Sequence, residues 1–331
     1  MRSHTVAALL VIGLVLACVR VTVAGSTSAT DPRPDLVCPY QPYELGLRSF
    51  CPVPNRPAGV LLHVRINGGR PLRLVLDSGA EFIVIGAKVA DSLGLSSRSE
   101  MDLVGLGTRS AKAGMAESVD IGPVSFRNCR VALVDGKVIE GADGVIPLAL
   151  FSDFLMRLDL PEKTLGLIPY PGEQGPAVSS NRAVGKSDLL LVRTVLNRKH
   201  HGYVVLDTGA FCSAISREVA GTLGGSHILP DLRIGAGTGA ARGQLISAAV
   251  HFEIAGQELV PNDVVALDLL NLSRHYGVEV VGVLGFPALS PYVLTIDYRS
   301  RLVKIEPKLT APPRQRYRSH HEDSRAQLAP P

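Results

Sequence analysis

The sequence contains no tryptophan, and aromatic residues make up only 5% of its 331 residues. This scarcity argues against a protein that stacks nucleic-acid bases on aromatic side chains. Charge points the same way, because the formal net charge of +4 comes from the N-terminal segment and the C-terminal tail, which leaves the body of the chain close to neutral. A nucleic-acid-binding domain would carry its basic residues on the folded part, so no nucleic-acid partner is expected.

Cysteine is also scarce, with five residues, and metal-binding spacings such as C-x-x-C and H-E-x-x-H do not occur in the sequence. No metal site is therefore expected. Cys38 and Cys51 flank a short segment ahead of the first strand-like run, and in an oxidising compartment a disulfide between them would close a structural loop. Cys212 is interpreted as a small buried side chain, because no histidine lies at a recognisable spacing for activating its thiol.

The apolar run near the N-terminus, residues 6–19, is shorter than the roughly 20 residues that a membrane-spanning helix needs. Arg2 precedes this run and small residues ending at Ala24 follow it, so residues 1–24 are predicted to be an export signal cleaved after Ala24. Two alternatives stay open: lipid attachment to Cys18, within a loose match to a bacterial lipobox, and an uncleaved membrane anchor. A periplasmic or extracellular location is expected, with attachment to the membrane under either alternative.

What the sequence does contain is an internal repeat. Leu-Val-Leu-Asp-Ser-Gly-Ala at residues 74–80 matches Val-Val-Leu-Asp-Thr-Gly-Ala at residues 204–210, an offset of 130. The same offset aligns two further groups of residues, and it grows to 138 closer to the C-terminus. The second copy is therefore longer by about eight residues, which we place around residues 269–278. Agreement at several independent positions indicates a duplicated structural unit.

The repeat divides the chain into two lobes. A stretch rich in Gly, Ser and Pro separates the copies, and a polar, Pro-rich tail follows the second copy. The predicted divisions are a signal peptide (1–24), an N-terminal extension (25–57), a first lobe (58–171), a linker (172–187), a second lobe (188–307) and a disordered tail (308–331).

Apolar runs within each copy are short, rich in β-branched residues and separated by Gly, Asn and Pro, which is typical of β-hairpins. One short helix is expected in each copy, at residues 87–93 and 217–223, because apolar residues there have helical spacing and a glycine follows. The fold class predicted is all-β, with one short helix per lobe.

The two matching triplets, Asp77-Ser78-Gly79 and Asp207-Thr208-Gly209, each follow an apolar strand. A single triplet of this kind is usually only a turn, but two equivalent copies suggest paired carboxylates. Two carboxyl groups held close together do not both ionise readily, so the pair keeps one proton. The ionised member can take a proton from a water molecule while the protonated member polarises a carbonyl. Amides of Gly79 and Gly209 are expected to reach the carboxylates, and the hydroxyls of Ser78 and Thr208 to hold their outer oxygens.

At these residues the sequence resembles the aspartic-protease clan, and within it the bacterial retropepsin-like aspartyl proteases that fuse two lobes in one chain. The resemblance covers residues 59–307 and also rests on the apolar-apolar-Gly element Val283-Leu284-Gly285 and on Asp-containing hairpins at residues 157–169 and 295–307. It implies two similar retropepsin/pepsin-like β-barrel lobes that form an intramolecular pseudo-dimer. It also implies an aspartic-type endopeptidase, with Asp77 and Asp207 as catalytic residues, a peptide or protein substrate, and no metal or other cofactor.

The Gly-rich stretches at residues 104–114 and 234–243 would then be flaps that bind substrate, with Gly105, Gly107, Gly235 and Gly237 permitting a mobile hairpin. A nucleotide-binding loop is disfavoured because the second stretch does not match G-x-G-x-x-G at the start of a helix and no P-loop lysine follows it. Neither stretch contains the flap tyrosine of pepsin-type enzymes, which favours the retropepsin-like branch.

Pro147 departs from the family pattern, because it occupies the position of the glycine in the apolar-apolar-Gly element of the first lobe. Loss of that glycine motivates a rival hypothesis, a non-catalytic peptide-binding protein with a protease-like cleft. In a second rival, each lobe would pair with another chain. One chain already supplies both acids, so a monomer is expected.

Overall fold

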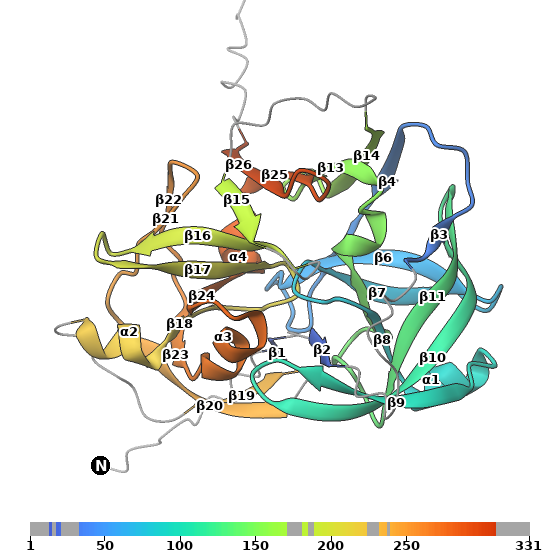
Figure 1. Ribbon diagram of the computed structural model, residues 1–331, viewed down its shortest axis with the longest axis horizontal. Helices are drawn as coiled ribbons and strands as arrows, with labels where there is room; N and C mark the ends of the chain where they lie inside the picture. Colours follow the sequence, from blue (N-terminus) through green and yellow to red (C-terminus); the bar gives the residue numbers. More distant parts are fainter. Residues whose placement is uncertain are drawn as a thin grey trace, which may run out of the picture.

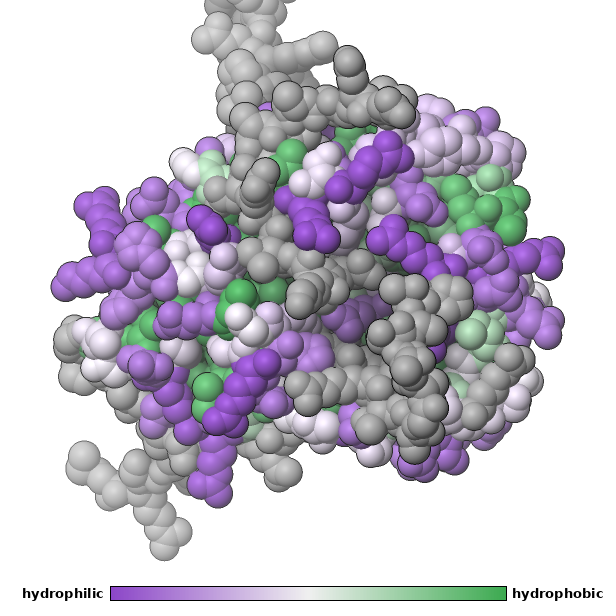
Figure 2. Space-filling model, in the orientation of Figure 1, coloured by the Kyte–Doolittle hydropathy of each residue, from purple (hydrophilic) through white to green (hydrophobic). Residues whose placement is uncertain are grey.

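The computed structural model describes residues 13–14, 18–20, 33–170, 181–184, 189–223, 232–236 and 239–308. These residues form two lobes rich in β-strands, joined by a further sheet to which both lobes contribute (Figure 1). Hydrophobic side chains on the face seen in Figure 2 occur as small separate groups among hydrophilic ones, because most large apolar residues are buried in the sheets. The predicted all-β fold is confirmed.

Lobe 1 is a strongly curved sheet in which the order β9-β10-β11-β8-β12-β7-β6 places strands far apart in sequence side by side. Its runs of Val, Leu and Ile are buried on both faces of several strands, as expected for a closed barrel-like sheet. The elements of this lobe are β6 (Gly59–Ile66), β7 (Leu72–Asp77), β8 (Ile83–Gly86), α1 (Ala87–Ser92), β9 (Ser97–Val104), β10 (Thr108–Ile121), β11 (Val124–Val134), β12 (Gly144–Pro147) and the 3-10 helix η1 (Leu148–Phe151).

Lobe 2 repeats this arrangement with the order β19-β20-β23-β18-β24-β17-β16. Its elements are β16 (Leu191–Leu196), β17 (His200–Asp207), β18 (Ser213–Ser216), α2 (Arg217–Thr222), β19 (Leu232–Ala236), β20 (Gly239–Ile246), β21 (Phe252–Ile254), β22 (Gln257–Leu259), β23 (Val264–Leu267), α3 (Leu270–Tyr276), β24 (Val280–Gly285) and α4 (Phe286–Leu289).

The expectation of one short helix per lobe is wrong for lobe 2. Helices α1 and α2 form where the sequence predicts them, but α3 and α4 are additional. Helix α3 lies in the stretch that lengthens the second copy. Asp268 Oδ1 accepts the amide of Leu270 at its start, and Gly277 ends it with a left-handed φ of 68°. Both end signals are present in the sequence.

A sheet between the lobes carries the predicted hairpins. It consists of β13 (Phe154–Asp159) and β14 (Thr164–Pro169) after lobe 1, β25 (Tyr292–Asp297) and β26 (Leu302–Pro307) after lobe 2, with β4 (Tyr43–Gly46) and β15 (Asn181–Val184) at its two ends. Strands β13 and β25 pair antiparallel and so connect the lobes directly. Strand β15 lies inside the predicted linker and pairs with β16 and β26; the other residues of 172–187 lie outside the described residues.

The N-terminal extension adds β3 (Asp35–Leu36) and β5 (Arg48–Phe50) to the sheet of lobe 1 and β4 to the sheet between the lobes. Strand β3 pairs with β11, β5 pairs with β6, and the ring of Phe50 packs against Phe211 of lobe 2 at 5.7 Å between centroids. The expected disulfide in this extension is not formed. Cys38 is a free, half-buried thiol packed against the core, and Cys51 is a free, exposed thiol.

The predicted export signal lies mostly outside the described residues. Its described parts are β1 (Gly13–Leu14), which pairs with β19, and β2 (Cys18–Arg20), which pairs with β9. In the described part of the chain, no helix is both long and apolar enough to cross a membrane.

Of the predicted disordered tail, residues 308–331, only Lys308 belongs to the described residues. Its Nζ lies 2.8 Å from the buried carboxylate of Asp159. Residues 309–331 lie outside the described residues.

Candidate active site

Each aspartate of the repeat stands at the end of a buried strand. Asp77 ends β7 and Asp207 ends β17, and each strand is flanked by a parallel neighbour, β12 or β24. Both carboxyl groups are fully buried. The apolar residues before each Asp therefore do more than fill the core, because they fix the position from which the acid projects.

The two triplets approach each other closely. A Cβ atom placed on Gly79 would lie 2.6 Å from Cγ of Asp207, and one on Gly209 would lie 2.5 Å from Cγ of Asp77. Each carboxyl group is thus packed against the glycine of the opposite lobe. Any larger residue at either position would collide with the opposite acid, so the predicted close approach of the backbone has a direct steric reason.

The glycine amides bind the acids as predicted. Gly79 N–H donates to Asp77 Oδ1 at 2.7 Å, and Gly209 N–H donates to Asp207 Oδ1 at 2.9 Å. Oδ2 of each acid is buried, and apart from the opposite carboxyl group no group in the described residues forms a hydrogen bond with it. The neighbouring carboxyl group is the natural partner for these two oxygens if a proton is shared between the acids.

The prediction that the hydroxyls hold the outer carboxylate oxygens is wrong. Ser78 Oγ donates to the carbonyl of Leu206 at 2.7 Å and accepts the amide of Thr208 at 3.0 Å. Thr208 Oγ1 likewise donates to the carbonyl of Leu76 at 2.7 Å and accepts the amide of Ser78 at 3.0 Å. The four bonds cross between the lobes and are fully buried, so these side chains lock the lobes together beneath the acids.

This lock gives a prediction about stability. Thr208→Val keeps the shape of the side chain but leaves the buried amide of Ser78 and the buried carbonyl of Leu76 without a partner. We expect the free energy of unfolding to fall by about 3 kcal/mol, measured by urea denaturation. Thr194→Val is the matched control, because Thr194 is also buried but makes one bond, to the carbonyl of Glu253, and its loss should cost about 1 kcal/mol. Equal losses in the two variants would contradict the cross-lobe lock.

Burial raises the pKa of both aspartates. For Asp77 the charge of Asp207 and a hydrogen bond with it raise the pKa further, against the lowering effect of the Gly79 amide. For Asp207 burial raises the pKa to about 7, although hydrogen bonds from Asp77 and from the amides of Gly209 and Ala210 lower it. The pair therefore holds a proton at pH values where an ordinary carboxyl group is ionised.

Pro147, which departs from the repeat, does not disturb the strand beneath Asp77. Pro147 pairs with Asp77 in the same register in which Gly285 pairs with Asp207. In lobe 2 the amide of Gly285 donates to Ser213 Oγ at 3.2 Å. The equivalent of Ser213 in lobe 1 is Ile83, whose side chain has no hydrogen-bond acceptor. A proline, which has no N–H, therefore costs no hydrogen bond at this position. The two changes compensate each other.

Both Gly-rich stretches predicted as flaps form hairpins. Strands β9 and β10 turn at residues 105–107, where the amide of Gly105 donates to the carbonyl of Gly107 at 2.8 Å. Strands β19 and β20 form the equivalent hairpin in lobe 2, with Gly235 in β19. Gly237 lies outside the described residues. A role of these glycines in substrate binding remains a prediction.

Other polar groups do not extend the site. Cys212 is buried, and burial raises the pKa of its thiol far above the usual range, which agrees with a packing role rather than a reactive one. No group of three or more His, Cys, Asp and Glu side chains among the described residues is arranged to hold a metal ion.

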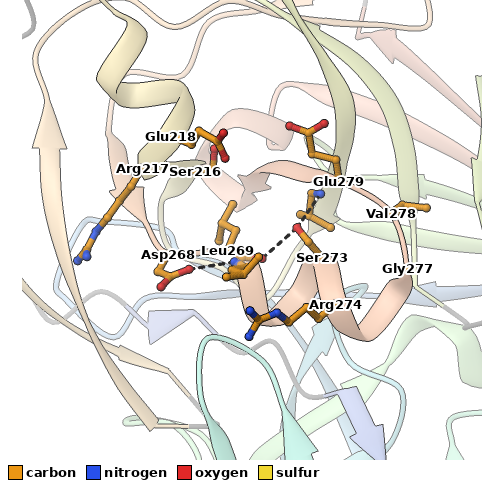
Figure 3. Close-up of a pocket in the computed structure, with 12 residues that line it drawn as sticks. Ser216, Arg217, Glu218, Asp268, Leu269, Ser273, Arg274, Gly277, Val278 and Glu279 are labelled. Carbon is orange, nitrogen blue, oxygen red and sulfur yellow. Dashed lines mark hydrogen bonds between the residues drawn. The ribbon is translucent and has the colours of Figure 1, made fainter.

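A pocket of about 770 Å³ opens on lobe 2 between α2 and α3. Figure 3 shows Arg217 and Glu218 of α2 on one side and Ser273 and Arg274 of α3 on the other. Neither aspartate of the repeat lines this pocket. The pocket is therefore separate from the acid pair.

Comparisons with known proteins agree with this geometry. The sequence model of the aspartyl protease family matches residues 62–147, which include the first triplet. The crystal structure of the aspartic proteinase from Irpex lacteus is similar with a TM-score of 0.52, covers 80% of this chain and 97% of its own, and is 11% identical in sequence. No curated protein matches the chain.

These findings show the fold of the chain and a family match within its first lobe. The chain has the two-lobed fold of the retropepsin/pepsin-like aspartyl proteases, and its first lobe carries the sequence features of that family. The predicted resemblance to the aspartic-protease clan is confirmed, and the narrower placement among the bacterial retropepsin-like proteases stays a prediction. Family match and fold together support aspartic protease activity in general.

Proposed function

We propose that the protein is an aspartic-type endopeptidase in which Asp77 and Asp207 activate a water molecule between them. The observation that carries this proposal is the mutual packing of the two acids, each against the glycine of the opposite triplet. Burial and the shared proton give the pair one acid and one base in contact, which is the combination that hydrolysis of an amide requires.

In the proposed reaction the ionised carboxylate takes a proton from the water molecule, and the oxygen of that water attacks the carbonyl carbon of the peptide. The protonated carboxyl group donates its proton to the carbonyl oxygen, which gives a tetrahedral diol. Collapse of this diol breaks the C–N bond. One diol hydroxyl returns its proton to the carboxylate that protonated the carbonyl, and the leaving nitrogen takes the proton that the base acquired from water. The pair ends with one proton, as it began, so each cycle needs only water and the peptide.

We propose further that the substrate is an extended peptide held beside the two hairpins. Strands β9 and β19 are outer strands of their sheets except where the short segments β2 and β1 pair with them. Such an edge can accept an extended chain through backbone hydrogen bonds, largely independently of its side chains. An unfolded protein should therefore be a better substrate than a folded one.

A cleavage assay tests this function. We expect the purified protein to cut an unfolded protein at acidic pH, with mass spectrometry of the products showing breaks at internal peptide bonds from the earliest time points. Stepwise loss of residues from one end would contradict an endopeptidase. Cleavage that a metal chelator abolishes would contradict a mechanism based on the two acids alone.

The rival function, peptide binding without turnover, was motivated by Pro147. Because Ile83 compensates for this proline and both triplets are intact, that motive is weakened. Tight binding of a pepstatin-like inhibitor, without hydrolysis of any unfolded protein over a broad pH range, would favour the rival.

A further inference from the structure

One contact between the lobes is not used by the proposed reaction. Asn271, on helix α3 of lobe 2, donates from Nδ2 to the carbonyl of Gly105 at 3.0 Å and to that of Gly107 at 3.4 Å. Both carbonyls belong to the turn between β9 and β10 in lobe 1. The Gly107 carbonyl also accepts the amide of Gly105, so the turn is itself ordered by a hydrogen bond. A single side chain of lobe 2 thus holds the tip of the lobe 1 hairpin at two points.

Apolar packing supports the same contact. Val104 is only 6% exposed and Leu106 is half-buried, and both belong to a hydrophobic cluster whose other members come from lobe 2. That cluster includes Leu269 and Leu272, which flank Asn271, and Ala210, which follows the second triplet. The hairpin tip therefore packs against the same cluster of side chains that contains Ala210, next to the second triplet.

The helix that makes this contact belongs to lobe 2 alone. Helix α3 occupies a stretch in which the second copy is longer than the first, and the described residues 135–143 at the equivalent position of lobe 1 contain no helix. The contact is therefore an addition to the duplicated unit and not a consequence of the repeat.

The hairpin also has a point at which it can bend. The pairing of β9 with β10 shifts register between Ala113 and Gly114, which marks a β-bulge or irregularity between the tip and the long base of the hairpin. Such an irregularity interrupts the ladder of hydrogen bonds and allows a local change of direction. Strand β10 pairs with β11 from Lys112 to Ile121, so the part of the hairpin beyond this pairing, residues 101–111, can move while the base stays paired.

We propose that Asn271 is a positioning residue that latches the lobe 1 hairpin closed against lobe 2. A peptide would then reach the acids only after this latch opens. The role in peptide entry rests on the proposed function, whereas the latch itself does not depend on catalysis. The latch connects the two lobes and does not contact the peptide. Its removal should therefore increase the rate at which the hairpin opens more than it changes the affinity of the protein for a peptide.

Hydrogen–deuterium exchange on the intact protein, without substrate, tests the latch directly. Asn271→Ala should raise the exchange rate of backbone amides in residues 101–110 about fivefold, the effect of losing about one hydrogen bond, while the hairpin base at residues 116–126 stays unchanged. Asn271→Asp should raise the rate more, because it replaces the donor with a carboxylate that faces two carbonyl oxygens.

Ser273→Ala is the matched control. Ser273 lies on the same helix, and its Oγ bonds the carbonyl of Leu269 and the amide of Val280 within lobe 2. Unchanged exchange at the hairpin tip in Asn271→Ala would overturn the latch, and so would an equal increase in Ser273→Ala, because the helix and not the amide would then be responsible. A protein without proteolytic activity that shows the expected exchange pattern would refute the proposed function and support the latch.

Discussion

Asp77→Asn and Asp207→Asn are each expected to abolish hydrolysis of an unfolded protein at acidic pH. An amide of the same shape can neither accept a proton from water nor donate one to the substrate in the required way. General acid–base catalysis is worth about 10²–10⁴-fold, and each variant disables the pair as a whole, so we expect kcat/KM to fall at least about 10³-fold. Initial rates on a peptide taken from the cleaved protein give this measurement.

Asp297→Asn is the control for these variants. Asp297 is also buried, at the end of β25, and its Oδ1 accepts the amide of Ser300, a bond that an asparagine can keep. It lies in the sheet between the lobes and outside the acid pair, so activity should be retained. Comparable activity in the wild type and in either dyad variant would reject catalysis by the two acids.

The second large effect concerns stability and pH. The pKa of both acids is raised in the folded protein, so the folded state holds a proton that the unfolded chain releases above pH 4. This contribution is fully present below pH 4 and is lost as the pH rises from about 4 to about 7. With 1.36 kcal/mol per pKa unit and a folded-state pKa of about 7 for Asp207, the loss of one proton from the pair accounts for on the order of 4 kcal/mol.

Urea denaturation of the wild type and of the double variant Asp77→Asn/Asp207→Asn at a series of pH values isolates this effect. Asp143 and Asp159, whose pKa values are lowered by Arg70 and by Lys308 respectively, titrate in both proteins and cancel in the comparison. As the pH rises from 4 to 7, the wild type should lose this stabilising contribution while the variant does not. The unfolding free energy of the variant should therefore rise relative to that of the wild type. Parallel pH profiles would show that the acids are not protonated above their ordinary range.

Much of the fold was accessible from the sequence because the duplication repeats every local signal. The two triplets, the short helices after β8 and β18, and the hairpins of the sheet between the lobes depend on residues close together in the chain. Hydrophobic runs that end in Asp-Ser-Gly or Asp-Thr-Gly determine where each acid emerges. These features need no knowledge of how the lobes meet.

The remaining features depend on contacts between distant segments or, for α3, on helix-end signals that lie outside the repeat. The partners of Ser78 and Thr208 lie about 130 residues away, and only the docking of the lobes shows that the hydroxyls bond backbone and not carboxylate. Asn271 has no equivalent in lobe 1, so the repeat gives no reason to select it. The helix that carries it could have been found from its flanking Asp268 and Gly277.

The central claim is that one proton lies between Asp77 and Asp207. A neutron crystal structure of the deuterated protein at mildly acidic pH measures this directly. The account predicts a single deuteron between facing carboxyl oxygens that lie about 2.5–3 Å apart. Two carboxyl groups separated by more than hydrogen-bond distance, or both without a deuteron, would contradict it.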